Sequence, residues 1–231
     1  MIELALAFYL VFILPVRTLW HSTRKDNKPK RPLAQRYFSS MREIGLLLLA
    51  LLLICWWNGY GAIDIGLALP SAGAPLWCLI AAAIAMAALL IGSGLSSHKM
   101  PPAKRAAALE SGRESGMPTN AAEMRMFLVL VLFIGAGWEL LYRGFLLLTL
   151  TPHIGTWGAV AVSGLAYGAA HGYKNPKQIS LSIASALLFA TGYVLSGSLW
   201  WLMVIHIALP LTGAISIYQL FQQEEARHAL S

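Results

Sequence analysis

The chain has 231 residues, of which 58% are hydrophobic and only 12% are charged. Soluble domains are typically about 45–50% apolar and about 25% charged, so this composition excludes an ordinary soluble protein and indicates a polytopic membrane protein. The net charge of +7 is no sign of nucleic-acid binding, because basic residues in membrane proteins usually mark cytoplasmic loops. Cys55 and Cys78 lie in apolar runs, which argues against a disulfide framework or a paired-thiol metal site.

Several apolar runs are long enough to cross a bilayer, which requires about 20 mostly apolar residues. The first run has Glu3 rather than basic residues ahead of it and no cleavage pattern after it, so we expect a retained span and not a signal peptide. The predicted fold class is all-α, a polytopic membrane helix bundle of about seven transmembrane helices. The predicted spans are about 2–19, 43–60, 72–95, 126–149, 155–173, 178–196 and 199–221.

The distribution of basic residues supports this number of spans. If seven spans alternate in direction, 16 of the 17 Lys and Arg residues fall on one side of the bilayer, and only Arg143 lies within a span. Basic loops are cytoplasmic as a rule. We therefore expect an integral multi-pass protein with its N-terminus outside, its C-terminus in the cytoplasm and the lipid bilayer as its surroundings.

A polar segment divides the spans into two groups. Residues 96–125 contain Pro, Gly, Ser and charged side chains, and are predicted to form a mobile cytoplasmic linker. Nothing in the sequence indicates an oligomeric state. The predicted organisation is an N-terminal three-helix membrane region at 1–95, the polar linker at 96–125, a four-helix core at 126–221 and a polar cytoplasmic tail at 222–231.

Ionisable residues inside the C-terminal spans are the candidate functional residues. Glu139 and Arg143 lie in the run MFLVLVLFIGAGWELLYRGFLLLTL, where each charge costs roughly 3 kcal/mol. His171 and His206 lie in two other spans. One carboxylate and two imidazoles are the ligand count of a catalytic zinc site with a fourth position open for water. Bound to such a metal, water has a pKa near about 7 and becomes a nucleophile.

Each of these residues also has a structural interpretation. A lone intramembrane histidine can simply hydrogen-bond two helices together. Glu139 and Arg143, at i and i+4, can neutralise each other on one helix face. Tyr167 shares a face with His171, and either belongs to the core or offers its hydroxyl to a site. By span position His171 lies some ~10 Å closer to the cytoplasm than Glu139 and His206, so tilt or an open cavity is needed to bring it near them.

Three motifs in this order resemble the CPBP family of intramembrane glutamic or metallo-endopeptidases, which includes CAAX-processing proteases and the bacteriocin-immunity (Abi) proteins. The family's Glu-Glu-x-x-x-Arg motif corresponds to WELLYRGFLLL, which contains Glu139 and Arg143. Its Phe-x-x-x-His motif corresponds to YGAAH, with Tyr167 and His171. Its final His-x-x-x-Asn or His-x-x-x-Asp motif corresponds to SGSLWWLMVIHIALP, with His206. The resemblance covers about residues 126–221.

The resemblance implies a bacterial plasma-membrane endopeptidase that cleaves a membrane-associated peptide or protein. It implies catalytic roles for Glu139, Arg143, His171 and His206, a substrate contact at Tyr167, and a divalent metal, zinc, held by Glu139, His171 and His206. No nucleic-acid partner is implied.

Two positions depart from the family pattern. Trp138 stands where the family has its first Glu, which is thought to activate the catalytic water, and Pro210 stands where it has Asn or Asp. Tryptophan offers only an N–H donor and proline offers no polar side chain, so both oxygen acceptors are lost. Two hypotheses therefore remain: an active endopeptidase, or a catalytically degenerate relative that acts as a membrane binding or scaffold protein. A transporter is less well supported, because no inverted repeat with broken helices is evident.

Overall fold

The computed structural model describes residues 2–24, 31–98 and 100–228, and within these ranges its regular elements are all helices. The predicted all-α fold class is confirmed. The elements in chain order are α1 (Ile2–Phe8), the π-helical turn η1 (Tyr9–Ile13), α2 (Leu14–Thr23), α3 (Leu33–Asn58), α4 (Gly73–His98), α5 (Pro102–Ser115), α6 (Ala121–Glu139), the π-helical turn η2 (Leu140–Phe145), α7 (Leu146–Ala170), α8 (Pro176–Ser196) and α9 (Trp200–His228).

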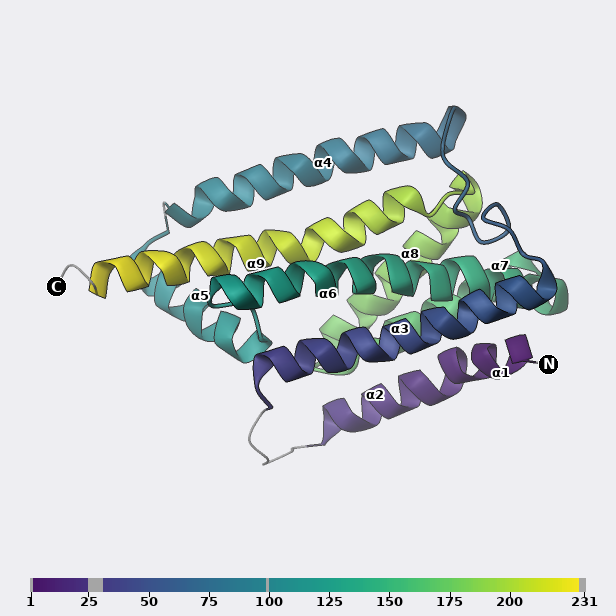
Figure 1. Ribbon diagram of the computed structural model, residues 1–231, viewed down its shortest axis with the longest axis horizontal. Coiled ribbons are helices and arrows are strands. Elements are labelled where there is room, and N and C mark those ends of the chain that lie inside the picture. The colour runs from purple at the N-terminus through teal and green to yellow at the C-terminus, as the bar shows by residue number, and fades with distance from the viewer. Residues whose placement is uncertain (1, 25–30, 99, 229–231) are drawn as a thin grey trace.

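Six helices of the described residues are long and apolar enough to cross a membrane, where the sequence predicted about seven. The difference arises in the 50-residue helical run Ala121–Ala170, which joins the predicted spans 126–149 and 155–173. Gly155 interrupts this run with φ 71° and ψ 164°. Beyond Gly155 the chain doubles back. The reversal is evident from the hydrogen bond that Ser163 donates to the Tyr142 carbonyl at 2.6 Å. The described chain begins and finishes at opposite ends of the bundle (Figure 1), which is the arrangement that an odd number of passes produces.

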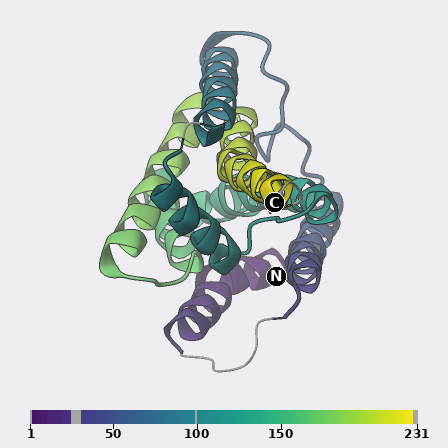
Figure 2. The same cartoon turned by 90° about the vertical axis from the view of Figure 1, so that its left-hand side faces the viewer.

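The bundle is built around α6 and α9. Helix α9 packs against α4 and α6, α3 packs against the other side of α6, and α8 packs against α7. Viewed along the bundle, α4 lies at one edge and α1 and α2 lie at the opposite edge (Figure 2). Two glycines make the centre compact: a Cβ on Gly135 would lie 2.4 Å from Ile207, and one on Gly137 would lie 2.5 Å from Ile44. This close packing brings α9, and His206 with it, against the end of α6 that carries Glu139.

The segment predicted to be a mobile linker contains a helix. Within 96–125, α5 packs against α9 and buries Leu109 beside Leu220 and Phe221. Leu109 and Gly112 of α5 face α9 three residues apart, although the helix is polar as a whole. Gly112 approaches α9 so closely that a Cβ there would lie 2.6 Å from Ile217.

The loop between α3 and α4 closes one end of the bundle. Its backbone carbonyl at Gly66 accepts a hydrogen bond from the Leu199 N–H at 3.0 Å, and its Leu67 carbonyl accepts one from the Trp200 indole at 3.2 Å. The Ile65 carbonyl lies so near Gly144 that a Cβ there would be 2.7 Å away. This loop therefore covers the end of η2 that points away from the basic loops.

Candidate functional site

The candidate site begins at the junction of α6 and η2. Glu139 is the last residue of α6, and η2 carries Arg143 one position before Gly144. The side chains of Glu139 and Arg143 are both fully buried, at 0% exposure. π-Helical turns inside α-helices are rare and occur frequently at functional sites, because the extra residue per turn redirects side chains. Here the turn lies within the motif that the sequence singled out.

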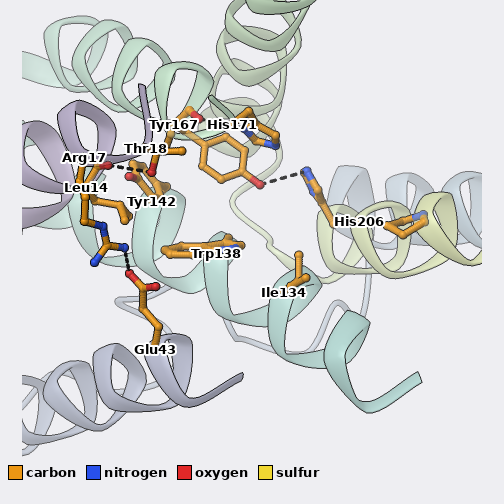
Figure 3. A pocket seen from close by; sticks show the side chains of 12 residues that line it. Leu14, Arg17, Thr18, Glu43, Ile134, Trp138, Tyr142, Tyr167, His171 and His206 are labelled. Atoms are coloured by element: carbon orange, nitrogen blue, oxygen red, sulfur yellow. Dashed lines mark hydrogen bonds and ion pairs between the residues drawn. The ribbon is translucent and has the colours of Figure 1, made fainter. Parts of the chain in front are cut away.

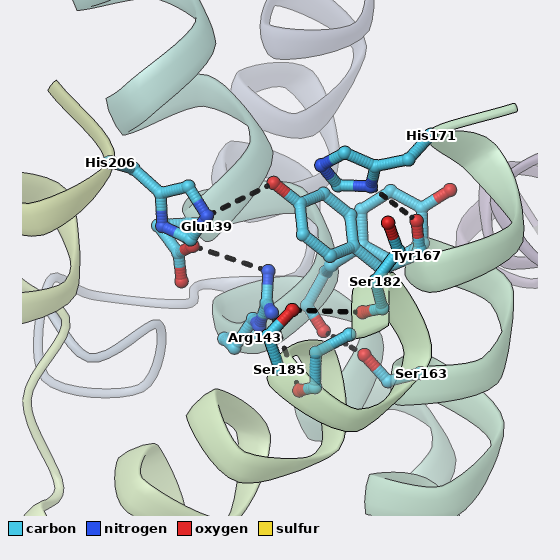
Figure 4. A network of polar contacts seen from close by, with 10 residues as sticks. Glu139, Arg143, Ser163, Tyr167, His171, Ser182, Ser185 and His206 are labelled. Atoms are coloured by element: carbon cyan, nitrogen blue, oxygen red, sulfur yellow. Dashed lines mark hydrogen bonds and ion pairs between the residues drawn. The ribbon is translucent and has the colours of Figure 1, made fainter. Parts of the chain in front are cut away.

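Glu139 is held on both sides by positively charged or chargeable groups (Figure 4). Nη1 of Arg143 donates to its Oε1 at 3.2 Å, and Nδ1 of His206 lies 2.6 Å from the same oxygen. Among the described residues, neither the second oxygen, Oε2, nor Nδ1 of His206 has a hydrogen-bond partner, so the close Glu139–His206 contact is an ion-pair distance without hydrogen-bond geometry. Arg143 is fixed in turn by the Ala186 carbonyl at 3.4 Å and by the ring of Tyr167, over which its guanidinium carbon lies at 4.1 Å. Buried charges are tolerated only when paired in this way.

Tyr167 lies between the two histidines. Its hydroxyl is 3.4 Å from Nε2 of His206, and its ring is 4.6 Å from the ring of His171 between centroids. Nδ1 of His171 hydrogen-bonds the Tyr167 backbone carbonyl at 2.9 Å, which fixes the imidazole at the end of α7. The structure thus brings all five sequence-predicted residues into one continuous network, in which Tyr167 contacts both His171 and His206.

A cavity of about 330 Å³ adjoins this network (Figure 3). Neither Glu139 nor Arg143 lines it, because both lie behind His206 and Tyr167. The two positions that depart from the family pattern, Trp138 and Pro210, do line it. Its walls are Leu14, Arg17, Thr18, Glu43, Ile134, Trp138, Tyr142, Tyr167, Ala170, His171, His206 and Pro210.

The expected zinc ligands do not form a ligand group in this arrangement. Among the described residues, no three His, Cys, Asp or Glu side chains lie close enough together to hold a metal ion. Glu139 is engaged with Arg143 and His206, whereas His171 is turned toward the backbone of its own helix. Zinc binding stays a prediction, to be tested by metal analysis.

The sequence argument missed two residues of the cavity, Arg17 of α2 and Glu43 of α3. They form an ion pair, and the Tyr9 hydroxyl also donates to Glu43, at 3.4 Å. Figure 3 shows this pair on one side of Trp138, with Tyr167 and His206 on the other. In the sequence, each of these residues lies close to the polar segment between the first two apolar runs, where basic residues indicate topology and a single Glu stands out from nothing around it.

Comparison with protein families gives one match. Residues 120–212 match the model described as Type II CAAX prenyl endopeptidase Rce1-like. The matched range contains both departures, Trp138 and Pro210, and excludes Arg17 and Glu43. Neither the curated proteins nor the solved structures give a match.

Proposed function

We propose that this chain is an intramembrane endopeptidase that hydrolyses a peptide bond in a membrane-associated substrate, because residues 120–212 match the model described as Type II CAAX prenyl endopeptidase Rce1-like. The observation that carries the proposal is the 2.6 Å contact between Glu139 Oε1 and His206 Nδ1. A small rotation of the His206 ring that points its Nδ1 proton at Glu139 would leave the lone pair of Nε2 facing Tyr167 in the wall of the cavity. A carboxylate behind an imidazole orients the ring and stabilises its protonated form, which suits it to general-base catalysis.

The proposed reaction uses the residues as follows. His206 Nε2 takes a proton from a water in the cavity as the water oxygen adds to the scissile carbonyl. The Tyr167 hydroxyl, which is the hydrogen-bond donor closest to Nε2, supports the carbonyl oxygen as negative charge develops there. His206 then returns the proton to the departing amine. Glu139 and Arg143 are positioning residues, because they hold His206 and do not reach the cavity. His171 offers its remaining ring nitrogen to the substrate at the cavity wall.

A specific observation favours a second candidate function. Trp138 and Pro210 line the cavity at the two positions where the family places oxygen acceptors, and neither side chain can accept a hydrogen bond. A chain of this kind can retain the Glu139–Arg143–His206 cluster to join its helices while its cavity binds a peptide, a lipid or a partner helix without cleaving it.

The test is turnover of a fluorogenic prenylated CAAX peptide by the full chain in nanodiscs. His206→Ala should lower the rate by at least about 100-fold, the scale of general-base catalysis. Glu139→Gln should lower kcat with little change in KM, since Glu139 acts through His206 and does not touch the substrate. The matched control is His153→Ala, an exposed histidine that does not line the cavity.

Three outcomes separate the candidates. Binding of the peptide by the wild-type chain without turnover supports the binding protein. Equal turnover by the wild type and by His206→Ala contradicts the proposed mechanism. Metal content measured on the same samples tests the zinc prediction: stoichiometric zinc, lost together with turnover in His171→Ala, would replace the His206 mechanism by a metal-dependent one.

A further inference from the structure

The Arg17–Glu43 pair separates two spaces. On one side it lines the inner cavity beside Trp138 and Tyr167. On the other it lines an open groove of about 390 Å³ between α2 and α3, whose walls are Tyr9, Arg17, Ser39, Arg42, Glu43, Leu46 and Leu47. Helices α2 and α3 make few backbone contacts here. The side chains of Arg17 and Glu43 therefore separate the groove from the cavity.

From this arrangement we propose that the groove binds the anionic head of a single-chain amphiphile, with a phosphate or carboxylate head group, whose chain extends past the Arg17–Glu43 partition into the inner cavity. This site goes beyond the proposed peptidase activity and does not depend on it. Its main residues, Arg17, Arg42 and Glu43, lie outside the Rce1-like domain at 120–212.

The charge of the groove selects an anion. Arg17 and Arg42 supply two guanidinium groups, and Glu43 offsets one of them. Among the described residues Arg42 has no ion-pair partner, and its side chain is exposed. A guanidinium fork matches the geometry of phosphate and carboxylate oxygens. The hydroxyl of Ser39 adds a donor in the same groove, whereas that of Tyr9 already donates to Glu43.

The remaining walls suit a hydrocarbon chain. Leu46 and Leu47 extend the groove, and on the cavity side Leu14, Ile134 and Trp138 form apolar walls. An occupant with a charged head and one apolar chain satisfies both surfaces at once, whereas a free inorganic anion satisfies only the first.

The probes are a matched pair of lipids, oleoyl lysophosphatidate and mono-oleoylglycerol, which share their chain and glycerol and differ in the phosphate. Binding to the full chain from neutral detergent is counted by native mass spectrometry, with oleate and inorganic phosphate as further arms. Lysophosphatidate should bind at least about tenfold more tightly than mono-oleoylglycerol, the effect expected of one charge-assisted contact. Oleate should share this preference. Inorganic phosphate should compete only weakly, because it lacks the chain.

Variants locate both ends of the ligand. Arg42→Gln should remove most of the preference for the anionic lipid, whereas the matched control Arg125→Gln, an exposed arginine on α6 outside the groove, should leave it unchanged. Glu43→Gln should tighten anion binding, because it removes the competing carboxylate from Arg17. Ala170→Phe, which fills the inner cavity, should weaken binding of the oleoyl lipid but not of a six-carbon phosphate.

Equal binding of the two glycerol lipids would overturn the proposal, as would equal losses in Arg42→Gln and Arg125→Gln. An unchanged affinity in Ala170→Phe would overturn the placement of the chain in the cavity. Because the readout is binding alone, these outcomes are independent of whether the chain cleaves a peptide.

Discussion

At the residue scale, the central feature is a carboxylate with two partners in the middle of a membrane protein. Glu139 has an oxygen 3.2 Å from Arg143 and 2.6 Å from His206, and it is fully buried. Breaking a buried pair by removing one partner costs far more than replacing both partners, because the remaining charge has neither water nor a counter-ion.

Glu139→Ala should therefore lower the free energy of unfolding by about 3–5 kcal/mol, since it leaves Arg143 unpaired at 0% exposure. The double variant Glu139→Leu with Arg143→Met should recover most of that loss. Denaturant unfolding of the purified chain in detergent measures both. A double variant as unstable as the single one would show that the pair is not the source of the effect.

Gly144 illustrates a second residue-scale requirement. A Cβ at this position would lie 2.7 Å from the Ile65 carbonyl, a backbone atom that cannot rotate away. Gly144→Ala should therefore displace the loop between α3 and α4 and lower the thermal midpoint of the purified chain. Gly92→Ala on α4 is the matched control, because a Cβ there meets nothing within 4 Å, and it should be neutral or stabilising by up to about 1 kcal/mol. Equal midpoints for the two variants would argue against the steric explanation.

At the element scale, the shape of the site depends on two departures from α-helical geometry. The π-helical turn η2 carries Arg143 toward Glu139 and Ala186, and Gly155 reverses the chain so that Tyr167 returns beside Tyr142, with ring centroids 4.9 Å apart. Without the reversal, Tyr167 and His171 would extend away from Glu139. By span position, His171 was expected to lie closer to the cytoplasm than His206. It joins the network because Tyr167 contacts both histidines.

Gly155→Ala tests the reversal. The residue has φ 71° and ψ 164°, a backbone region that is essentially restricted to glycine, while a Cβ there would meet nothing within 4 Å. The change should cost about 1–3 kcal/mol from backbone strain alone. Gly59→Ala, at φ 72° and ψ 22° in the less demanding left-handed helical region, should cost less, about 1–2 kcal/mol. Unfolding free energies of the two variants make the comparison, and a smaller loss at Gly155 would count against this account.

At the scale of the whole molecule, the arrangement of basic residues predicts the orientation in the membrane. In a variant lacking Cys55 and Cys78, we expect a membrane-impermeant maleimide added to intact cells to label Ser71→Cys in the loop between α3 and α4. It should not label Ser111→Cys in α5, because α5 lies with the basic segments that face the cytoplasm. Both positions are exposed, so accessibility within the protein does not differ. The opposite labelling pattern would invert the topology.

The N-terminal region also takes part in the whole-molecule arrangement. Among the described residues, α2 and α3 supply the oppositely charged pair on the walls of the inner cavity, Arg17 and Glu43. The Tyr142 hydroxyl of η2 donates to the Leu10 carbonyl of η1 at 2.9 Å, so the two π-helical turns are joined directly. Residues outside the matched range 120–212 thus complete the cavity beside it.

The sequence by itself determined the membrane class, the all-α fold, the approximate positions of the spans and the likeness of residues 120–212 to the Rce1-like model, and it singled out five polar residues that the structure brings into contact. These follow from local hydropathy, from the cost of ionisable groups in an apolar run and from motifs of a few residues. The catalytic roles, the zinc ligands and the orientation stay predictions. Only the tertiary structure decided that α5 is a helix and that the chain reverses at Gly155 between two predicted spans. It also decided that Glu139 lies behind His206, and that Arg17 and Glu43 line the same cavity as Trp138 and Pro210. The physical reason is that these features depend on how helices far apart in sequence approach and cross, which is set by close contacts such as those of Gly135 and Gly137 and leaves no periodic signal in any one segment.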